Sequence, residues 1–324
     1  MGAFLSAGAL AMKSVLALFS SLLVASSVSA ASPLITPAEL QPLVASAAVR
    51  VIDVRDPKSY AAAHIPGALN APYGSWRGPA SSPGELPELA KLTAQVQRLG
   101  LTPATRTVVV SSGADATDFG AAARVYWTLK VLGLKELSVL NGGVKAWAAA
   151  GLPQDANPVS VAASNFQPTL DGSMIATRDE VAQAIERNNA ALVDARPADF
   201  FNGQTRHAAA RSAGTLKGAV NVEHSSWFAQ GSSTFVSTDE ARRIAAALNL
   251  DPKRDTLSFC NTGHWAATNW FALSEVLGQP QVKLYAGSMV DWTSAPQALP
   301  MDNAPGRAGQ LMVDFKIWAA RTFN

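Results

Sequence analysis

The sequence predicts an α/β protein with two tandem domains, each a parallel sheet flanked by helices. Its length of 324 residues suits about two domains at roughly 100–200 residues each. A series of apolar strands and apolar helices occupies residues 51–147 and recurs in residues 192–292. Strands that alternate with helices are typical of parallel sheets covered by helices on both faces. The sequence therefore predicts two domains of the same fold.

Four pairs of matched segments define this repeat. Each copy opens with a short apolar run that ends in Asp-x-Arg, which is typical of a buried strand reaching a loop. A turn containing Gly-Ala, a second apolar strand with a helix behind it, and a Gly-containing turn before a Trp follow in both copies. The pairs are residues 51–55 and 192–196, 64–70 and 215–221, 107–132 and 256–277, and 140–147 and 284–292.

The repeat also sets the expected domain boundaries. We expect a first domain over residues 32–155 and a second over residues 174–300. Residues 156–173 between them are polar, contain two prolines and lack helical periodicity, which predicts a linker.

Residues 301–324 form a C-terminal tail. We expect this tail to begin as a loop and to end in a helix. The tail contains the aromatic residues Phe315, Trp318 and Phe323, and we expect the helical tail to dock on the body of the protein, with a functional aromatic patch as the alternative.

Composition and charge exclude several classes of protein. The 26 basic and 24 acidic residues leave a net charge of +2, so no strong global attraction to nucleic acid or anionic membranes is expected. A single cysteine excludes an internal disulfide and a multi-cysteine zinc site. His207 and His224 have no Cys or carboxylate at ligand spacing, so no metal is predicted. No phosphate-binding motif surrounds Gly142 and Gly143, and no cofactor is predicted.

The N-terminus has the pattern of a secretory signal peptide. Lys13 precedes an apolar run over residues 15–24, and small residues follow up to Ala31. We therefore expect residues 1–31 to be removed and the mature protein to be periplasmic or secreted. The run is too short to span a bilayer comfortably, so no stable membrane insertion is expected after cleavage. An uncleaved anchor is the alternative.

The loop after Cys260 is the segment most typical of a reactive site. An apolar strand delivers Cys260 to its end, a short loop follows, and a helix begins near Ala266. Ligand sites in open α/β sheets lie at the carboxyl ends of the strands. Backbone N–H groups of such a loop and the helix N-terminus favour an anion, and therefore a nucleophilic thiolate. The predicted site consists of Cys260, Asn261, Thr262, Gly263, His264 and Trp265.

These segments together resemble the rhodanese family of sulfurtransferases in its tandem two-domain form. The resemblance rests on residues 53–55, 64–68, 140–147 and the Cys260 loop, and it covers the mature chain. It implies that Cys260 takes a sulfane sulfur from a donor such as thiosulfate or 3-mercaptopyruvate and holds it as a persulfide. A thiol or cyanide then accepts the sulfur, which is covalent ping-pong catalysis. It also implies an inactive first domain, with Ser112 at the position equivalent to Cys260.

Departures from the family pattern concern the sulfur donor. Thiosulfate-using members tend to place Arg and Lys directly after the Cys, where this chain has Asn261 and Thr262. An Arg is usual where this chain has Phe200. Thiosulfate is therefore expected to be a poor donor. Arg206 and Arg211 are predicted to substitute as donor-binding cations, or else to be solvated surface charges.

Other roles remain open at this point. His264 is expected either to support the thiolate and donate a proton, or to be a loop residue held by a backbone hydrogen bond. A phosphatase on the same fold needs an Arg six residues after the Cys, where this chain has Ala266. The alternative to an enzyme is a non-enzymatic binding or sulfur-relay module on this fold.

Overall fold

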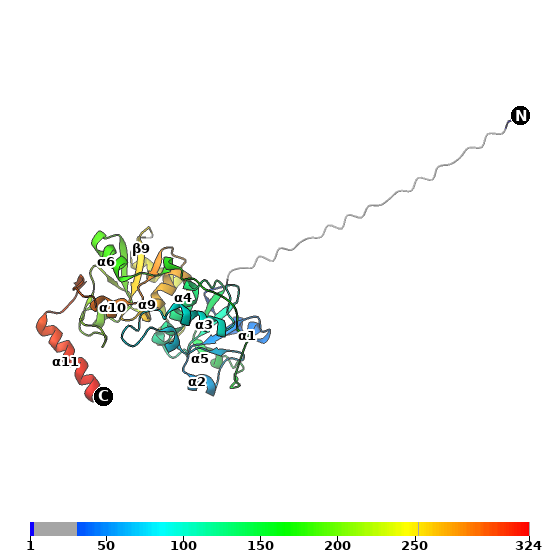
Figure 1. Ribbon diagram of the computed structural model, residues 1–324, viewed down its shortest axis with the longest axis horizontal. Coiled ribbons are helices and arrows are strands. Elements are labelled where there is room, and N and C mark those ends of the chain that lie inside the picture. The colour runs from blue at the N-terminus through cyan, green and yellow to red at the C-terminus, as the bar shows by residue number, and fades with distance from the viewer. Residues whose placement is uncertain (3–30, 252, 324) are drawn as a thin grey trace. The chain divides into compact units, whose positions relative to one another are not determined.

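Two parallel sheets of matching strand order organise the described part of the chain (Figure 1). The computed structural model describes residues 1–2, 31–251 and 253–323. The first sheet has five strands in the order β1-β5-β4-β2-β3, and every pair is parallel. Its strands are β1 (Leu34–Ile35), β2 (Arg50–Asp53), β3 (Leu69–Asn70), β4 (Thr107–Val110) and β5 (Leu137–Leu140).

The second sheet repeats this order with four parallel strands, β10-β9-β6-β8. A single parallel bridge from Ile175 to Leu284 occupies the place that β1 has in the first sheet. Its strands are β6 (Ala190–Asp194), β8 (Val220–Asn221), β9 (Asp255–Phe259) and β10 (Val282–Leu284). The predicted fold class, two tandem α/β domains with parallel sheets flanked by helices, is confirmed.

Helices connect the strands in both domains. Corresponding helices begin with the same capping box, in which Thr36 pairs with Glu39 before α1 and Thr177 pairs with Glu180 before α6. The α-helices are α1 (Pro37–Ala45), α2 (Pro57–Ala62), α3 (Leu89–Arg98), α4 (Ala116–Val131), α5 (Gly143–Ala149), α6 (Arg178–Arg187), α7 (Ala198–Phe201), α8 (Thr238–Ala247), α9 (Trp265–Trp270), α10 (Ser288–Thr293) and α11 (Arg307–Phe323). The 3₁₀-helices are η1 (Tyr73–Trp76), η2 (Gly172–Met174) and η3 (His224–Trp227), and η4 (Phe271–Val276) continues α9 as a π-helix.

The two domains share one apolar core where α4 of the first domain packs on α9 of the second. Phe119 and Phe271 make an edge contact across this junction at 5.5 Å between ring centroids. At its edge Glu275 accepts a hydrogen bond from Tyr126 Oη at 2.7 Å and pairs with Lys130 at 2.5 Å. This packing brings residues of the first domain next to the loop that follows β9.

The predicted linker lies against the first domain. Residues 156–171 contain no helix or strand, and the Ser164 N–H and hydroxyl donate to the carbonyls of Gln97 and Leu101. The exact domain boundaries stay predictions.

The C-terminal tail differs from expectation in two respects. It begins with strand β11 (Met301–Asp302), which pairs antiparallel with β7 (Thr215–Leu216), rather than with a loop. Its helix α11 is present, but Phe315 and Trp318 are 60% and 53% exposed. The predicted docking of the helical tail on the body is confirmed, but the contact is made by the opposite side of α11 through Val313 and not by these two aromatic residues. The side chain of Phe323 lies outside the described residues.

Most of the predicted signal peptide also lies outside the description, which omits residues 3–30. Within the described residues, no helix is both long and apolar enough to cross a membrane.

Candidate active site

Cys260 lies at the carboxyl end of β9, at the position that the sequence predicted. Its side chain is 1% exposed and forms part of the wall of a cavity of about 260 Å³, which we call the Cys260 cavity. The loop that follows turns into α9 at Trp265. The cavity is lined by Tyr73, Arg77, His207, Cys260, Asn261, Thr262, His264 and Trp265. The structure thus brings together Cys260 and four of the five predicted loop residues, with Gly263 behind them.

The Cys260 loop is folded around the hydroxyl of Ser288. Ser288 Oγ accepts hydrogen bonds from Cys260 N at 3.0 Å and Gly263 N at 3.2 Å, and donates to Tyr285 O. Gly263 has φ +67°, and a Cβ there would lie 2.5 Å from Arg124 Nη1 and 2.6 Å from Ala286 O. A side chain at residue 263 would therefore push the loop out of place.

Arg77 brings a positive charge from the first domain to the Cys260 cavity. Its Nη1 donates to Tyr73 Oη and its Nη2 donates to Thr262 O, both at 2.8 Å. No carboxylate is among the residues that line the cavity. The charge of Arg77 is therefore not neutralised there by an acidic side chain.

A second guanidinium, that of Arg124 on α4, lies behind the loop. Arg124 is buried, and it donates to Gly263 O at 3.2 Å and to Gly84 O at 2.8 Å. Burial lowers the pKa of Arg124 to about 9, which leaves it protonated at neutral pH. With Arg77 it makes the surroundings of the Cys260 loop positive, which favours the binding of an anion there.

Hydrogen bonds at both ring nitrogens hold His264. Nε2 lies 2.8 Å from Thr117 O, and Nδ1 lies 2.8 Å from Tyr73 Oη. A carbonyl only accepts, so Nε2 carries the proton and Nδ1 accepts from Tyr73. Burial, followed by the charge of Arg77, lowers the pKa of His264 to about 3. A neutral ring with both nitrogens in hydrogen bonds favours the second of the predicted alternatives, a loop residue held by a backbone hydrogen bond, over a proton donor.

Trp265 forms one wall of the cavity and is held by aromatic neighbours. It stacks on His224 with ring centroids 4.8 Å apart and meets Phe200 edge-on at 5.9 Å. Phe200, where the family pattern places Arg, therefore contacts Trp265.

The two arginines predicted to bind the donor do not line the Cys260 cavity. Arg206 pairs with Asp314 of α11 at 2.9 Å and donates to Ala210 O at 2.6 Å. Arg211 is exposed. Their role in donor binding stays a prediction, without support from this geometry. His207, the next residue after Arg206 in the sequence, does line the cavity.

Each Asp-x-Arg motif forms an ion pair that braces a loop. Asp194 and Arg196 are buried and 2.6 Å apart, and Arg196 Nη1 also approaches Asn261 Oδ1 at 3.4 Å. The pair Asp53 and Arg55 has the same length in the first domain. Both ion pairs therefore have a structural role in their loops.

Comparison of the two sheets corrects the residue assigned as the counterpart of Cys260. Asp53 pairs with Val110 and Asp194 pairs with Phe259, so the next residues, Ser111 and Cys260, are equivalent. The Val144 N–H donates to Ser111 O just as the Met289 N–H donates to Cys260 O. The prediction of Ser112 was one residue too far, because two serines follow β4 and only the strand pairing shows which of them stands opposite Cys260.

Sequence reasoning missed several residues of the site. Ser288 was detectable, because it stands where the first copy has the second glycine of its Asn-Gly-Gly turn. Tyr73, Arg77 and Arg124 had no such signal, because their contact with the loop depends on how α4 and α9 pack.

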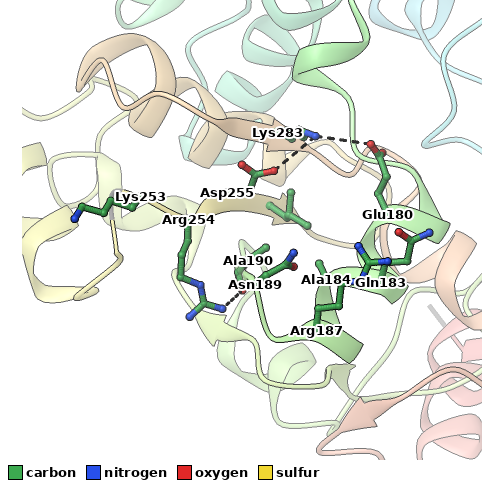
Figure 2. Close-up of a pocket in the computed structure, with 11 residues that line it drawn as sticks. Glu180, Gln183, Ala184, Arg187, Asn189, Ala190, Lys253, Arg254, Asp255 and Lys283 are labelled. Carbon is green, nitrogen blue, oxygen red and sulfur yellow. Dashed lines mark hydrogen bonds and ion pairs between the residues drawn. The ribbon is translucent and has the colours of Figure 1, made fainter.

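A second cavity, of about 290 Å³, lies at the opposite ends of the strands, where β6 and β9 begin (Figure 2). Lys283 stands between Glu180 and Asp255 there, at 3.7 Å from each. Its lining contains no cysteine, so it does not supply the nucleophile that the predicted chemistry needs.

The fold and the site together place the chain in a class of proteins. Its members have two tandem α/β domains, and the second domain has a loop with a cysteine at the end of a strand. Both copies match the family model described as rhodanese-like domain, over residues 36–150 and 177–295. The chain belongs to the rhodanese family.

The chain is similar in sequence to two bacterial proteins named thiosulfate sulfurtransferase. The thiosulfate sulfurtransferase of Azotobacter vinelandii is 30% identical over 263 residues, which is 81% of this chain and 94% of the relative. The thiosulfate sulfurtransferase of Pseudomonas aeruginosa is 30% identical over 264 residues, with the same shares of 81% and 94%.

Solved structures show the same fold. A 3-mercaptopyruvate sulfotransferase from Escherichia coli has a TM-score of 0.69 at 24% identity, over 79% of this chain and 98% of its own. An anaerobic ergothioneine biosynthesis enzyme from Chlorobium limicola has a TM-score of 0.74 at 21% identity, over 84% of this chain and 71% of its own.

Proposed function

We propose that this protein is a sulfurtransferase that carries a sulfane sulfur as a persulfide on Cys260. The observation that carries the proposal is the position of Cys260, the chain's one cysteine, in a cavity with positive surroundings at the end of β9. The relatives named thiosulfate sulfurtransferase and the likeness to a 3-mercaptopyruvate sulfotransferase support the sulfurtransferase class.

The reaction has two displacement steps. The Cys260 thiolate attacks the sulfane sulfur, a sulfur–sulfur bond forms, and the rest of the donor leaves with the electron pair of the broken bond. A thiolate or cyanide acceptor then attacks the outer sulfur, and Cys260 leaves as thiolate. Each step needs an anion to be stabilised beside the loop, and Arg77 and Arg124 supply positive charge there.

The charges in the Cys260 cavity suggest the class of donor. One arginine, Arg77, lines it, while Asn261 and Thr262 are neutral. We propose a donor with a single anionic group, held by Arg77, beside a less polar part that contacts Trp265. Thiosulfate, a dianion, is expected to react more slowly than such a donor.

The experiment that tests this function is intact-mass analysis after exposure to several sulfur donors. The protein is expected to gain the mass of about one sulfur atom, and to lose it on addition of a thiol or cyanide. Cys260→Ser should abolish the gain, whereas the matched change Ser111→Ala in the first domain should leave it intact. If no donor loads the protein, the non-enzymatic alternative is the correct one.

We also propose that the mature protein acts in the periplasm or is secreted. The basic residue Lys13, the apolar residues 15–24 and the small residues before Ala31 support this location. N-terminal sequencing of protein from cell fractions should find a chain that starts after Ala30 or Ala31 outside the cytoplasm. Finding the uncut chain in the cytoplasm would contradict it.

A further inference from the structure

Helix α11 (Arg307–Phe323) is an addition beyond the two family domains, since the second match ends at residue 295. Figure 1 shows it at the C-terminal end of the chain, in red. One side is fixed to the second domain. Val313 is 5% exposed, Asp314 pairs with Arg206, and Gln310 Oε1 accepts from Ala213 N at 3.2 Å.

The other side of α11 exposes large apolar residues. Residues separated by three, four and seven positions share one face of an α-helix. Phe315 and Trp318 lie together on that face, with ring centroids 5.7 Å apart. The exposed fractions are 69% for Leu311, 59% for Met312, 60% for Phe315 and 53% for Trp318. Contiguous apolar patches of this kind mark interaction surfaces.

Charge on the helix favours an anionic partner. Residues 307–323 contain three basic side chains, from Arg307, Lys316 and Arg321, and one acidic side chain, from Asp314. Arg307 and Lys316 are exposed, and Asp314 is paired with Arg206 on the docked side, so it does not offset their charge. Basic residues beside a face of Leu, Phe and Trp are the pattern of helices that lie in a membrane interface.

The charge of the helix argues against a second copy of the chain. A second copy would bring the same excess of positive charge to the interface, and like charges that face each other are unfavourable. We infer that the exposed face of α11 binds the surface of an anionic lipid bilayer, with the helix lying in the plane of the interface. This association is independent of sulfur transfer.

The test is co-sedimentation with vesicles, using the chain from Ser32 onward so that the apolar N-terminal segment does not contribute. This chain keeps the compact unit that begins at Ala31 essentially whole. Vesicles of phosphatidylglycerol mixed with phosphatidylcholine are compared with vesicles of phosphatidylcholine alone. We expect several-fold more binding to the anionic vesicles, reduced at 0.5 M salt, since salt screens exposed charges.

Variants locate the binding face. Leu311→Asp with Phe315→Asp should lower binding at least about tenfold, because charges would enter the apolar interface. The matched control is Leu89→Asp with Leu170→Asp, which changes two exposed leucines elsewhere (38% and 43% exposed) and should bind like the parent. Retained sulfur transfer in both double variants would show that the fold is intact.

Three results would overturn the inference. The first is equal binding by the parent and the Leu311→Asp, Phe315→Asp variant, and the second is no binding by the parent to anionic vesicles. The third is a dimer in sedimentation velocity that this variant abolishes, which would assign the face to a second copy. None of these results would affect the sulfurtransferase proposal, which depends on Cys260.

Discussion

The loop after Ser111 in the first domain and the loop after Cys260 in the second have equivalent places in the fold, but they differ in the charged groups near their backbone N–H groups. In the first loop the carboxylate of Asp118 accepts the Gly113 N–H at 2.6 Å. That loop therefore contains its own anion. Residues 260–264 contain no carboxylate, and the guanidinium groups of Arg77 and Arg124 lie beside them. The two loops thus differ in whether a carboxylate already accepts from the backbone N–H groups.

A single equivalent position shows how each loop is supported. Gly143 and Ser288 both have positive φ, at +60° and +53°. A Cβ at Gly143 would lie 2.5 Å from Gly113 N and 2.6 Å from Ser111 O, so the first loop leaves no room for a side chain. The second loop holds a serine there, whose hydroxyl accepts two loop N–H groups. The hydroxyl compensates for a backbone conformation that favours glycine.

The largest effect beyond loss of Cys260 should come from Arg77, the charge that the first loop does not have. Arg77→Ala is expected to lower kcat/KM for an anionic donor about tenfold to a hundredfold, as for the loss of a charge-assisted hydrogen bond. Arg77→Lys should restore part of it, because the charge returns without the forked geometry. Steady-state kinetics of the three proteins make the measurement. An unchanged kcat/KM in Arg77→Ala would remove Arg77 from donor binding.

Ser288 should have a smaller effect on the reaction and a measurable one on stability. Ser288→Ala leaves the buried Cys260 and Gly263 N–H groups without their acceptor, at a cost of about 1–3 kcal/mol. We expect kcat/KM to fall about tenfold as the loop shifts. Denaturant unfolding and kinetics measure the two effects.

A matched change in the first loop sharpens this result. Asp118→Asn removes the carboxylate that accepts from the first loop, and it should lower stability while leaving kcat/KM unchanged. If Asp118→Asn instead lowers kcat/KM as much as Ser288→Ala, the two loops are not functionally distinct.

How far the sequence predicts this molecule can be seen from particular residues. The Asp-x-Arg pairs, the strand before Cys260 and the helix after it follow from local patterns, and the structure has them. Arg77 and Arg124 could not be predicted, because their place depends on the packing of two helices 150 residues apart in the chain, roughly the length of one domain. For α11 the sequence favoured a docked tail over an aromatic patch, because an apolar face ordinarily packs inward, and it did not predict which side of the helix docks.

A moderate gain is expected from adding a cation to the Cys260 loop. Thr262 lines the cavity, whereas Asn261 is 5% exposed beside Arg196, where a second guanidinium would be repelled. Thr262→Lys should therefore raise kcat/KM for thiosulfate several-fold, while Thr262→Gln, of similar length and no charge, should not. Rates with thiosulfate that are high in the parent and equal in both variants would show that a dianionic donor needs no added charge.

The smallest effect should come from His264, and it should appear in stability rather than in rate. Its pKa of about 3 in the folded protein lies below the ordinary value of 6.5, so the folded state favours the neutral ring. The stability it contributes is complete above pH 6.5 and is lost as pH falls from 6.5 toward 3.

The parent should therefore lose more Tm between pH 7.5 and 4.5 than His264→Gln does, by about 2 °C or more. The carboxylates titrate in both proteins, so the difference isolates His264. The dependence of kcat/KM on pH between 6 and 9 should have the same shape in both proteins, because the ring stays neutral throughout. A Tm difference that does not change with pH would show that His264 is not held neutral by Tyr73 and Thr117. An altered rate profile would restore it as a candidate proton donor, and the two loops would then differ in acid–base chemistry as well as in charge.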